Sequence, residues 1–191
     1  GRKAYRFTVR FGIETDTDDA EGREVATSDV RPSDADILNA LPSFLGEIQQ
    51  VPPAYSALKI GGERAYDLAR EGEEVVLQAR PVTIYRLEMV ERPDADHAVL
   101  EAECGKGTYV RAIARDLGRL LGAHGHVSAL RRTQVGTFEE ADLVPLEELQ
   151  ARAEEGEAAL ADVLEPVDIA LEELPQLSVT PQDAHRLRCG Q

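Results

Sequence analysis

The chain has 191 residues, of which 42% are hydrophobic and 30% charged, a balance typical of a globular protein and unlike that of a disordered one. No run of about 18 apolar residues is present, which excludes a membrane-spanning helix, and the first residues lack the apolar core of a secretory signal. Two cysteines are too few for a disulfide framework, so we expect a cytoplasmic protein.

The net charge of −15 is unevenly distributed along the chain. Residues 139–183 hold 14 acidic side chains and one basic one, whereas residues 104–138 hold six basic side chains and one acidic one. Because a phosphate responds to the local field and not to the overall charge, the acidic composition is compatible with a basic surface that binds nucleic acid.

The first half of the chain predicts short strands and one capped helix. Residues 4–12 alternate between apolar and polar side chains, as expected for a half-buried strand, and residues 23–27 return as a second strand after a turn. Ser33 is expected to cap the helix that follows. Residues 54–60 predict a further strand and residues 64–71 a short helix.

Residues 81–92 and 97–104 predict a β-hairpin in which side chains alternate between the two faces. One face of the first strand is expected to carry Tyr85, Leu87 and Met89.

A helix is predicted over residues 110–121, where apolar side chains recur at helical spacing. Arg111, Arg115 and Arg119 lie at i, i+4 and i+8, so they are expected to line another face of this helix.

The last part of the chain combines a strand over residues 126–135, acidic helices over 145–155 and 157–164, a strand over 174–179 and a helix over 181–187. Strands and helices are interspersed without regular βαβ alternation. The predicted fold class is therefore α+β, with a mostly antiparallel mixed sheet and flanking helices.

Neither candidate metal motif has the required pattern. The acidic segment 16–22 differs from a calcium-binding loop because its fifth and sixth positions are alanine and glutamate, so we expect a tight turn in which Asp and Thr side chains bond local amides. His124, His126 and Cys104 lack the paired cysteines of a typical zinc site. No metal site is predicted.

The basic side chains after residue 104 have two interpretations. Free amides at the start of the predicted helix, beside Lys106, form a candidate anion site, and Tyr5 and Tyr109 offer faces on which bases could stack. Alternatively, the arginines only solvate a helix and the tyrosines belong to the core.

Five blocks of residues carry more information when they are read together. They are Lys3-Ala4-Tyr5 with residues 11–22, residues 51–59 with 62–66, residues 79–82, residues 106–111 and residues 130–136. In their order and spacing these blocks resemble the bacterial tRNA pseudouridine synthase B (TruB) family over about residues 2–150. Residues 174–191 resemble the opening of that family's PUA RNA-binding domain.

The resemblance implies a pseudouridine synthase catalytic domain over residues 1–173 and the start of a PUA domain over residues 174–191. The family isomerises uridine 55 in the T-loop of tRNA to pseudouridine, and the base must first leave its stack. An essential aspartate acts on the nucleotide, without a metal or organic cofactor. The implied partner is the T-stem-loop of tRNA, and no stable protein partner is implied.

Roles for individual residues also follow from the resemblance. Tyr5 matches the tyrosine that stacks on the flipped base and takes part in proton removal at C5. Arg131 matches the arginine that ion-pairs with the catalytic aspartate. Six further residues are expected to contact RNA: Lys59, Lys106, Tyr109, Arg111, Arg115 and Arg132.

The chain departs from the family in one respect. The family's catalytic aspartate lies upstream of the Tyr5 strand, in a Gly-His-x-Gly-x-Leu-Asp-type motif, and the chain starts after that motif, at a residue other than methionine. Asp16, Asp18 and Asp19 belong to a different motif. We therefore expect the 191 residues to be a fragment that is truncated at the N-terminus and inactive alone.

Two other classes of function are left open by the sequence. One is a non-catalytic RNA-binding relative that never had the aspartate. The other is an acidic protein-interaction domain centred on residues 139–183, which would bind tRNA with little dependence on salt.

Overall fold

A computed structural model describes residues 1–56, 59–60, 63–64, 77–171, 174–175 and 178–190. The chain divides into two units. The first comprises Gly1–Val135 and Glu139–Ala141, and the second comprises Gly136–Phe138 and Asp142–Gln191.

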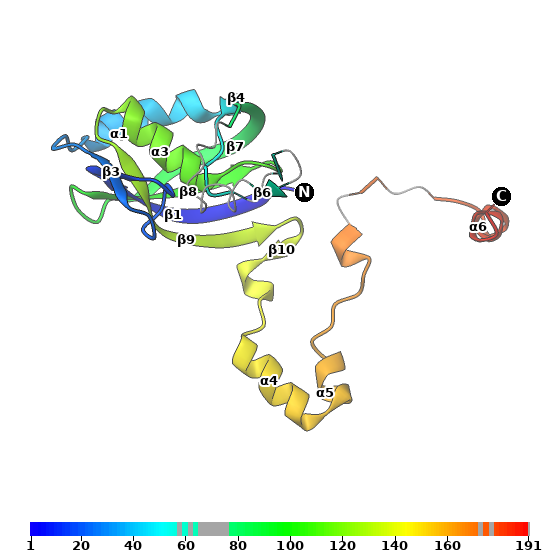
Figure 1. The fold of residues 1–191 in the computed structure, drawn as a ribbon. Helices are drawn as coiled ribbons and strands as arrows, with labels where there is room; N and C mark the ends of the chain where they lie inside the picture. The colour runs from blue at the N-terminus through cyan, green and yellow to red at the C-terminus, as the bar shows by residue number, and fades with distance from the viewer. Residues whose placement is uncertain (57–58, 61–62, 65–76, 172–173, 176–177, 191) are drawn as a thin grey trace. The chain divides into compact units, whose positions relative to one another are not determined.

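The first unit is built on a six-stranded sheet with the strand order β10-β9-β1-β8-β7-β4 (Figure 1). The sheet strands are β1 (Lys3–Phe11), β4 (Gly46–Gln50), β7 (Arg80–Glu91), β8 (His97–Cys104), β9 (Gly125–Val135) and β10 (Phe138–Glu139), the last at the boundary between the units. The other elements are β2 (Ile13–Thr15), β3 (Glu24–Thr27), α1 (Asp34–Ala40), η1 (Leu41–Phe44), β5 (Lys59–Ile60), β6 (Glu63–Arg64) and α3 (Val110–Leu120). The α+β fold with an antiparallel sheet is confirmed, since β1 pairs antiparallel with β8 and β9, and β7 with β4 and β8.

Strand β1 alternates as its sequence predicts. Phe7 and Val9 are almost completely buried, while Arg6 and Arg10 are exposed. The buried side chains pack into one core with α1 and α3, which Figure 1 shows on the same side of the sheet. This side is called the helix face below, and the other side the open face. On the open face, ion pairs such as Arg6–Glu101 at 2.7 Å line the solvent boundary.

Local signals in the sequence set the start of α1. Ser33 forms a capping box, because its hydroxyl accepts the Asp36 backbone N–H and the Asp36 carboxylate accepts the Ser33 backbone N–H. The predicted cap is therefore confirmed.

The prediction that Tyr85, Leu87 and Met89 share one face is confirmed for Leu87 and Met89, which both contact the core, and is wrong for Tyr85. The register between β7 and β8 shifts between Ile84 and Arg86, so Ile84 and Leu87 are buried while Tyr85 is 47% exposed. A bulge of this kind inserts one residue and reverses the alternation that follows.

Three other predicted elements differ from the structure. Of the described residues in the predicted strand 54–60, only Lys59–Ile60 form a strand. The predicted helix 64–71 lies outside the described residues except for Arg64, which belongs to β6. The described residues of the predicted strand 174–179 form no strand.

The second unit contains α4 (Leu146–Glu155), α5 (Glu157–Ala161), η3 (Ile169–Leu171) and α6 (Pro181–Arg188), and η2 (Glu140–Asp142) spans its boundary. None of the residues in these helices is buried. Thr180 caps α6 by accepting the Asp183 backbone N–H. In the described parts of both units, no helix is long and apolar enough to cross a membrane. The domain boundary predicted at residue 173 stays a prediction.

Candidate functional site

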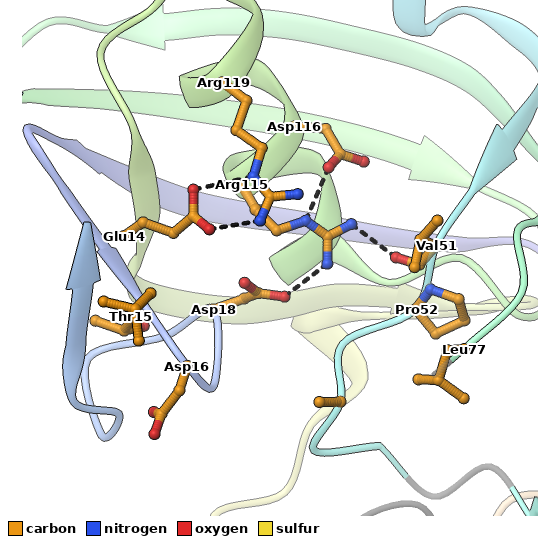
Figure 2. A pocket seen from close by; sticks show the side chains of 12 residues that line it. Glu14, Thr15, Asp16, Asp18, Val51, Pro52, Leu77, Arg115, Asp116 and Arg119 are labelled. Atoms are coloured by element: carbon orange, nitrogen blue, oxygen red, sulfur yellow. Dashed lines mark hydrogen bonds and ion pairs between the residues drawn. The ribbon is translucent and has the colours of Figure 1, made fainter. Parts of the chain in front are cut away.

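Helix α3 is joined to the segment Glu14–Asp19 by three arginines spaced one helical turn apart. Their side chains leave the helix on one side, as the spacing predicts. Each bonds a different carboxylate: Arg111 bonds Asp19 at 2.9 Å, Arg115 bonds Asp18 at 2.9 Å, and Arg119 bonds Glu14 at 2.5 Å. Figure 2 shows the second and third of these pairs. Much of the positive charge of this helix is therefore met by acidic side chains of the same chain.

The Arg111 guanidinium is held by two segments of the chain. Its Nη1 donates to the Thr17 carbonyl and to the Asp19 carboxylate, both at 2.9 Å, and its Nη2 donates to the Tyr55 carbonyl at 2.7 Å. The Arg111 side chain is 24% exposed. Among the described residues, the Nε–H of Arg111 donates to no acceptor. The group is thus fixed in orientation by three of its five N–H donors, while the Nε–H and the second Nη2–H have no acceptor among the described residues.

Arg115 makes the same kind of link one turn further along α3, but it is buried. It donates to the Asp18 carboxylate at 2.9 Å, to the Val51 carbonyl at 2.7 Å and to Asp116 at 2.8 Å. Only 7% of its side chain is exposed, so it offers almost no surface to a ligand.

Glu14 is 6% exposed and has two cationic partners. Arg119 bonds both of its carboxylate oxygens, and the ring Nδ1 of His124 lies 3.1 Å from one of them. Burial opposes the ionisation of Glu14, but the hydrogen bonds of Arg119 and His124 outweigh it and lower the pKa of Glu14. Glu14 is therefore charged at neutral pH.

A pocket of about 370 Å³ lies between the Glu14–Asp18 segment, α3 and the start of the segment that follows β4 (Figure 2). Carboxylates outnumber guanidinium groups in its lining, since Asp16 and Asp116 join Glu14 and Asp18 there. This pocket is accordingly unsuited to a phosphate group.

Asp18 is the most constrained of these carboxylates. It is 5% exposed and has a φ angle of 60°, in the left-handed region that few residues other than glycine adopt. Burial raises the pKa of Asp18 to about 6, against the opposing attraction of Arg115.

The raised pKa of Asp18 makes stability depend on pH. Because folding favours the protonated carboxyl, its contribution to the free energy of unfolding is complete below the unfolded pKa near 3.8 and is lost as the pH rises through about 6. Relative to Asp18→Asn, the wild type is expected to gain about 2 kcal/mol as the pH falls from about 7 to about 4. Denaturant unfolding at several pH values measures this difference.

Asp36→Asn is the matched control for this measurement. Hydrogen bonds from Ser33 lower the pKa of exposed Asp36, so its contribution to stability is lost as the pH falls, which is the opposite direction. A difference between wild type and Asp18→Asn that stays constant with pH would contradict the expectation.

Tyr5 lies on the helix face of the sheet and is 9% exposed. Its register partners are Ala102 on β8 and Arg132 on β9, and the Arg132 guanidinium carbon lies 5.5 Å from the centre of the Tyr5 ring. Tyr5 and Arg132 therefore share one face.

Arg131 is on the opposite face from Tyr5. The register pairs Arg131 with Arg6, whose side chain is on the open face, and Arg131 bonds Glu140. The structure therefore does not bring together the two side chains for which the resemblance implied catalytic roles.

The turn before α3 holds Lys106 and Tyr109. Lys106 is exposed. Tyr109 is the N-cap residue of α3. The Gln50 side-chain amide forms two hydrogen bonds with the Tyr109 backbone: its oxygen accepts the Tyr109 N–H at 2.9 Å, and its nitrogen donates to the Tyr109 carbonyl at 3.2 Å. Gln50 is 2% exposed, so the start of α3 is fixed by a buried amide.

Of the other predicted site residues, Lys59 has its backbone in β5, and its side chain lies outside the described part of the chain. The segment 16–22 is a turn, as predicted, in which Asp16 accepts the Arg23 N–H and Asp19 accepts the Glu21 N–H. No group of three potential metal ligands occurs among the described residues.

The sequence interpretation missed the long-range roles of Asp18, Asp19 and Gln50. All three bond to α3 or to the residue before it, from segments about 60 to 100 positions away. The one signal in the sequence for Asp18 and Asp19 was a cluster of acidic side chains in the segment Glu14–Asp19, which could pair with the three arginines predicted on one side of α3.

Comparison with known proteins adds a family to this geometry. Residues 1–110 match the model of the TruB family pseudouridylate synthase N-terminal domain, and residues 111–172 match that of the tRNA pseudouridylate synthase B C-terminal domain. The chain is 61% identical over 194 residues to the tRNA pseudouridine synthase B of Bradyrhizobium diazoefficiens and 62% identical to that of Rhodopseudomonas palustris. It spans just over half of these relatives, 56% and 53% of their lengths.

A solved structure shares the fold. The chain superposes with a TM-score of 0.74 on a chain in the crystal structure of a Cbf5-Nop10-Gar1 complex, covering all of this chain and 49% of that one at 23% identity. Because residues 1–110 match the family's N-terminal model and residues 111–172 its C-terminal model, the chain belongs to the TruB family of pseudouridylate synthases.

Proposed function

We propose that this chain is part of a tRNA pseudouridine synthase that isomerises uridine 55 in the T-loop. The reaction breaks the bond between N1 of the base and C1′ of the ribose, turns the base, and joins C5 to C1′. The carboxylate that acts on the nucleotide belongs to the motif upstream of β1, outside the 191 residues. The proposal is supported by the relatives' name and by the immobilised Arg111 on the side of the sheet that carries Tyr5.

In this proposal Tyr5 stacks on the flipped uracil and takes part in removing the proton from C5. Tyr5 is on β1, a central strand of the sheet, and the rigid backbone there fixes the position of the ring, which suits a stacking role. Arg132, close to the same ring, would neutralise a nearby phosphate or hold the base edge.

We assign the orientation of the catalytic carboxylate to Arg111 and not to Arg131. A carboxylate beside Tyr5 would be on the helix face, where α3 lies, whereas Arg131 projects from the other face. The three bonds that Arg111 already makes fix its plane, and its two remaining donors, Nε–H and the second Nη2–H, suit an ion pair with a carboxylate.

The proposed RNA contacts are made by exposed side chains near these groups. Lys106 and Arg132 are exposed, and Tyr109 is half-buried. Lys59 stays a candidate through the family motif. The burial of Arg115 favours a supporting role over contact with RNA.

Binding of a T-stem-loop RNA tests the proposal with the 191-residue chain itself. Since a few phosphates would be contacted, affinity is expected to fall at least about tenfold between about 50 and 200 mM salt. A stem of the same length that is closed by an unrelated tetraloop is the control, and it should bind more weakly. Binding that is independent of both salt and loop would favour an acidic protein-interaction domain.

An assay for pseudouridine in the same mixture of the 191-residue chain and T-stem-loop RNA distinguishes binding from catalysis. The 191-residue chain is expected to produce no pseudouridine above background, because the proposed nucleophile is not among its residues. Multiple turnovers by the purified chain would overturn this part of the proposal and would require a nucleophile within residues 1–191.

A further inference from the structure

We propose that Asp18 and Arg115 form a positioning pair that holds the Val51–Ser56 segment in register with the start of α3, so that the Arg111 guanidinium is correctly oriented on the face that meets the RNA. The inference rests on the proposed function for its RNA readout. It assigns a role to a buried ion pair that contacts no substrate itself.

The first argument is that one guanidinium joins three parts of the chain. Arg115 bonds the Asp18 carboxylate, the Val51 carbonyl and Asp116 of its own helix. The first two partners are 97 and 64 positions away from Arg115. A planar guanidinium with donors in fixed directions sets the distance and angle between such partners, which a lysine ammonium would not.

The second argument is that Arg111 links the same two segments. Its partners are Thr17 and Asp19 in the turn and Tyr55 in the other segment. Arg115 binds Asp18, which lies between Thr17 and Asp19, and Val51, which precedes Tyr55 in the same segment. The buried link therefore determines where the backbone acceptors of Arg111 lie, and hence where the Arg111 guanidinium points.

The third argument is the backbone conformation of Asp18. The φ angle of Asp18 is in the left-handed region, which is strained for residues other than glycine, and such residues persist where their surroundings fix them. The Asp18 backbone N–H donates to the Thr15 carbonyl at 3.2 Å, and its own carbonyl accepts the Val127 N–H at 3.1 Å. The turn is thus tied to β9 on one side and to Arg115 on the other.

A buried ion pair does not have to stabilise the fold. Removing one partner leaves an unpaired buried charge, whereas replacing both with neutral groups is often nearly neutral for stability. This difference allows a positioning role to be separated from a purely structural one.

The test compares Arg115→Gln with the double variant Asp18→Asn/Arg115→Gln in the 191-residue chain. Arg115→Gln is expected to lower the midpoint of thermal unfolding, to raise hydrogen exchange of the Val51 and Ala54–Ser56 amides at least tenfold, and to weaken T-stem-loop binding about tenfold. Pro52 and Pro53 have no amide hydrogen. The double variant should recover most of the thermal stability. It should not recover slow exchange or RNA affinity, because the bond to the Val51 carbonyl is still missing.

Arg119→Gln is the matched control. It removes an ion pair between α3 and Glu14, but among the described residues Arg119 donates no hydrogen bond to the Val51–Ser56 segment, so exchange there should change less than about threefold.

The outcomes separate the two proposals. Recovery of exchange and affinity together with stability in the double variant, or unchanged exchange in Arg115→Gln, would overturn the positioning role. If the wild-type chain fails to bind the T-stem-loop at all, the proposed function fails, while the exchange comparison still decides whether the pair holds Val51–Ser56.

Discussion

Arg111→Lys is expected to lower the rate of pseudouridine formation by about 100-fold or more. Lysine keeps the charge but cannot hold the Thr17, Asp19 and Tyr55 oxygens in one plane while it also orients a carboxylate. The loss of one preorganised donor at a reacting centre typically costs this much in rate. The measurement is the initial rate on a T-stem-loop, in extracts of cells in which the variant gene replaces the native copy, normalised to the amount of enzyme.

Arg131→Lys is the matched comparison, because it makes the same chemical change on the other face of the sheet. Its ion pair with Glu140 lies at the surface, where such pairs contribute little. We expect its rate to stay within about threefold of wild type. The reverse order, with Arg131→Lys inactive and Arg111→Lys active, would show that the family role belongs to Arg131 after all.

Gly118→Ala is expected to destabilise the first unit by about 3 kcal/mol or more. A Cβ at this position of α3 would lie 2.4 Å from the Gly125 backbone nitrogen and 2.4 Å from the His124 carbonyl carbon. These are backbone atoms at the start of β9, so they cannot rotate away. The loss should outweigh the gain of about 1 kcal/mol in helix propensity that alanine brings.

Denaturant unfolding measures this effect, with Leu120→Ala as the control on the same helix. Leu120 is 59% exposed, so its truncation should cost less than about 1 kcal/mol. A Gly118→Ala variant as stable as wild type would mean that α3 can move away from β9. The three arginine links would then be weaker constraints than the distances indicate.

The periodicity of apolar side chains predicted those strands and helices whose formation depends mainly on residues close in sequence. The alternation along residues 4–12 and the apolar stripe of residues 110–121 each reflect burial of one face against the same core, and both were confirmed except at Leu120, which is exposed. The Ser33 cap was also predictable, because the partners in a capping box are only three residues apart.

The bulge before Arg86 could not be predicted in this way. An inserted residue changes no composition and leaves a β-like pattern on both sides, so an apolar alternation through Tyr85 appeared continuous. The register of β7 against β8 depends on pairing across the sheet, which no local signal carries.

The candidate site was only partly predictable for the same reason. The spacing of Arg111, Arg115 and Arg119 indicated a shared side of α3, but not what that side meets. The local charge predicted that this side of α3 is a solvated surface that could reach RNA. In the structure the Glu14–Asp19 segment lies against it and pairs with the arginines. Charge counted over residues 104–138 overlooks acidic partners that come from elsewhere in the chain.

The central claim, that this chain belongs to an enzyme that makes pseudouridine in the T-loop of tRNA, is tested most directly in its source cells. The gene segment that encodes residues 1–191 is deleted, and uridine 55 is mapped chemically in total tRNA. We expect unmodified uridine at that position, with pseudouridine restored by the wild-type gene. Unchanged pseudouridine at position 55 in the deleted cells would contradict it.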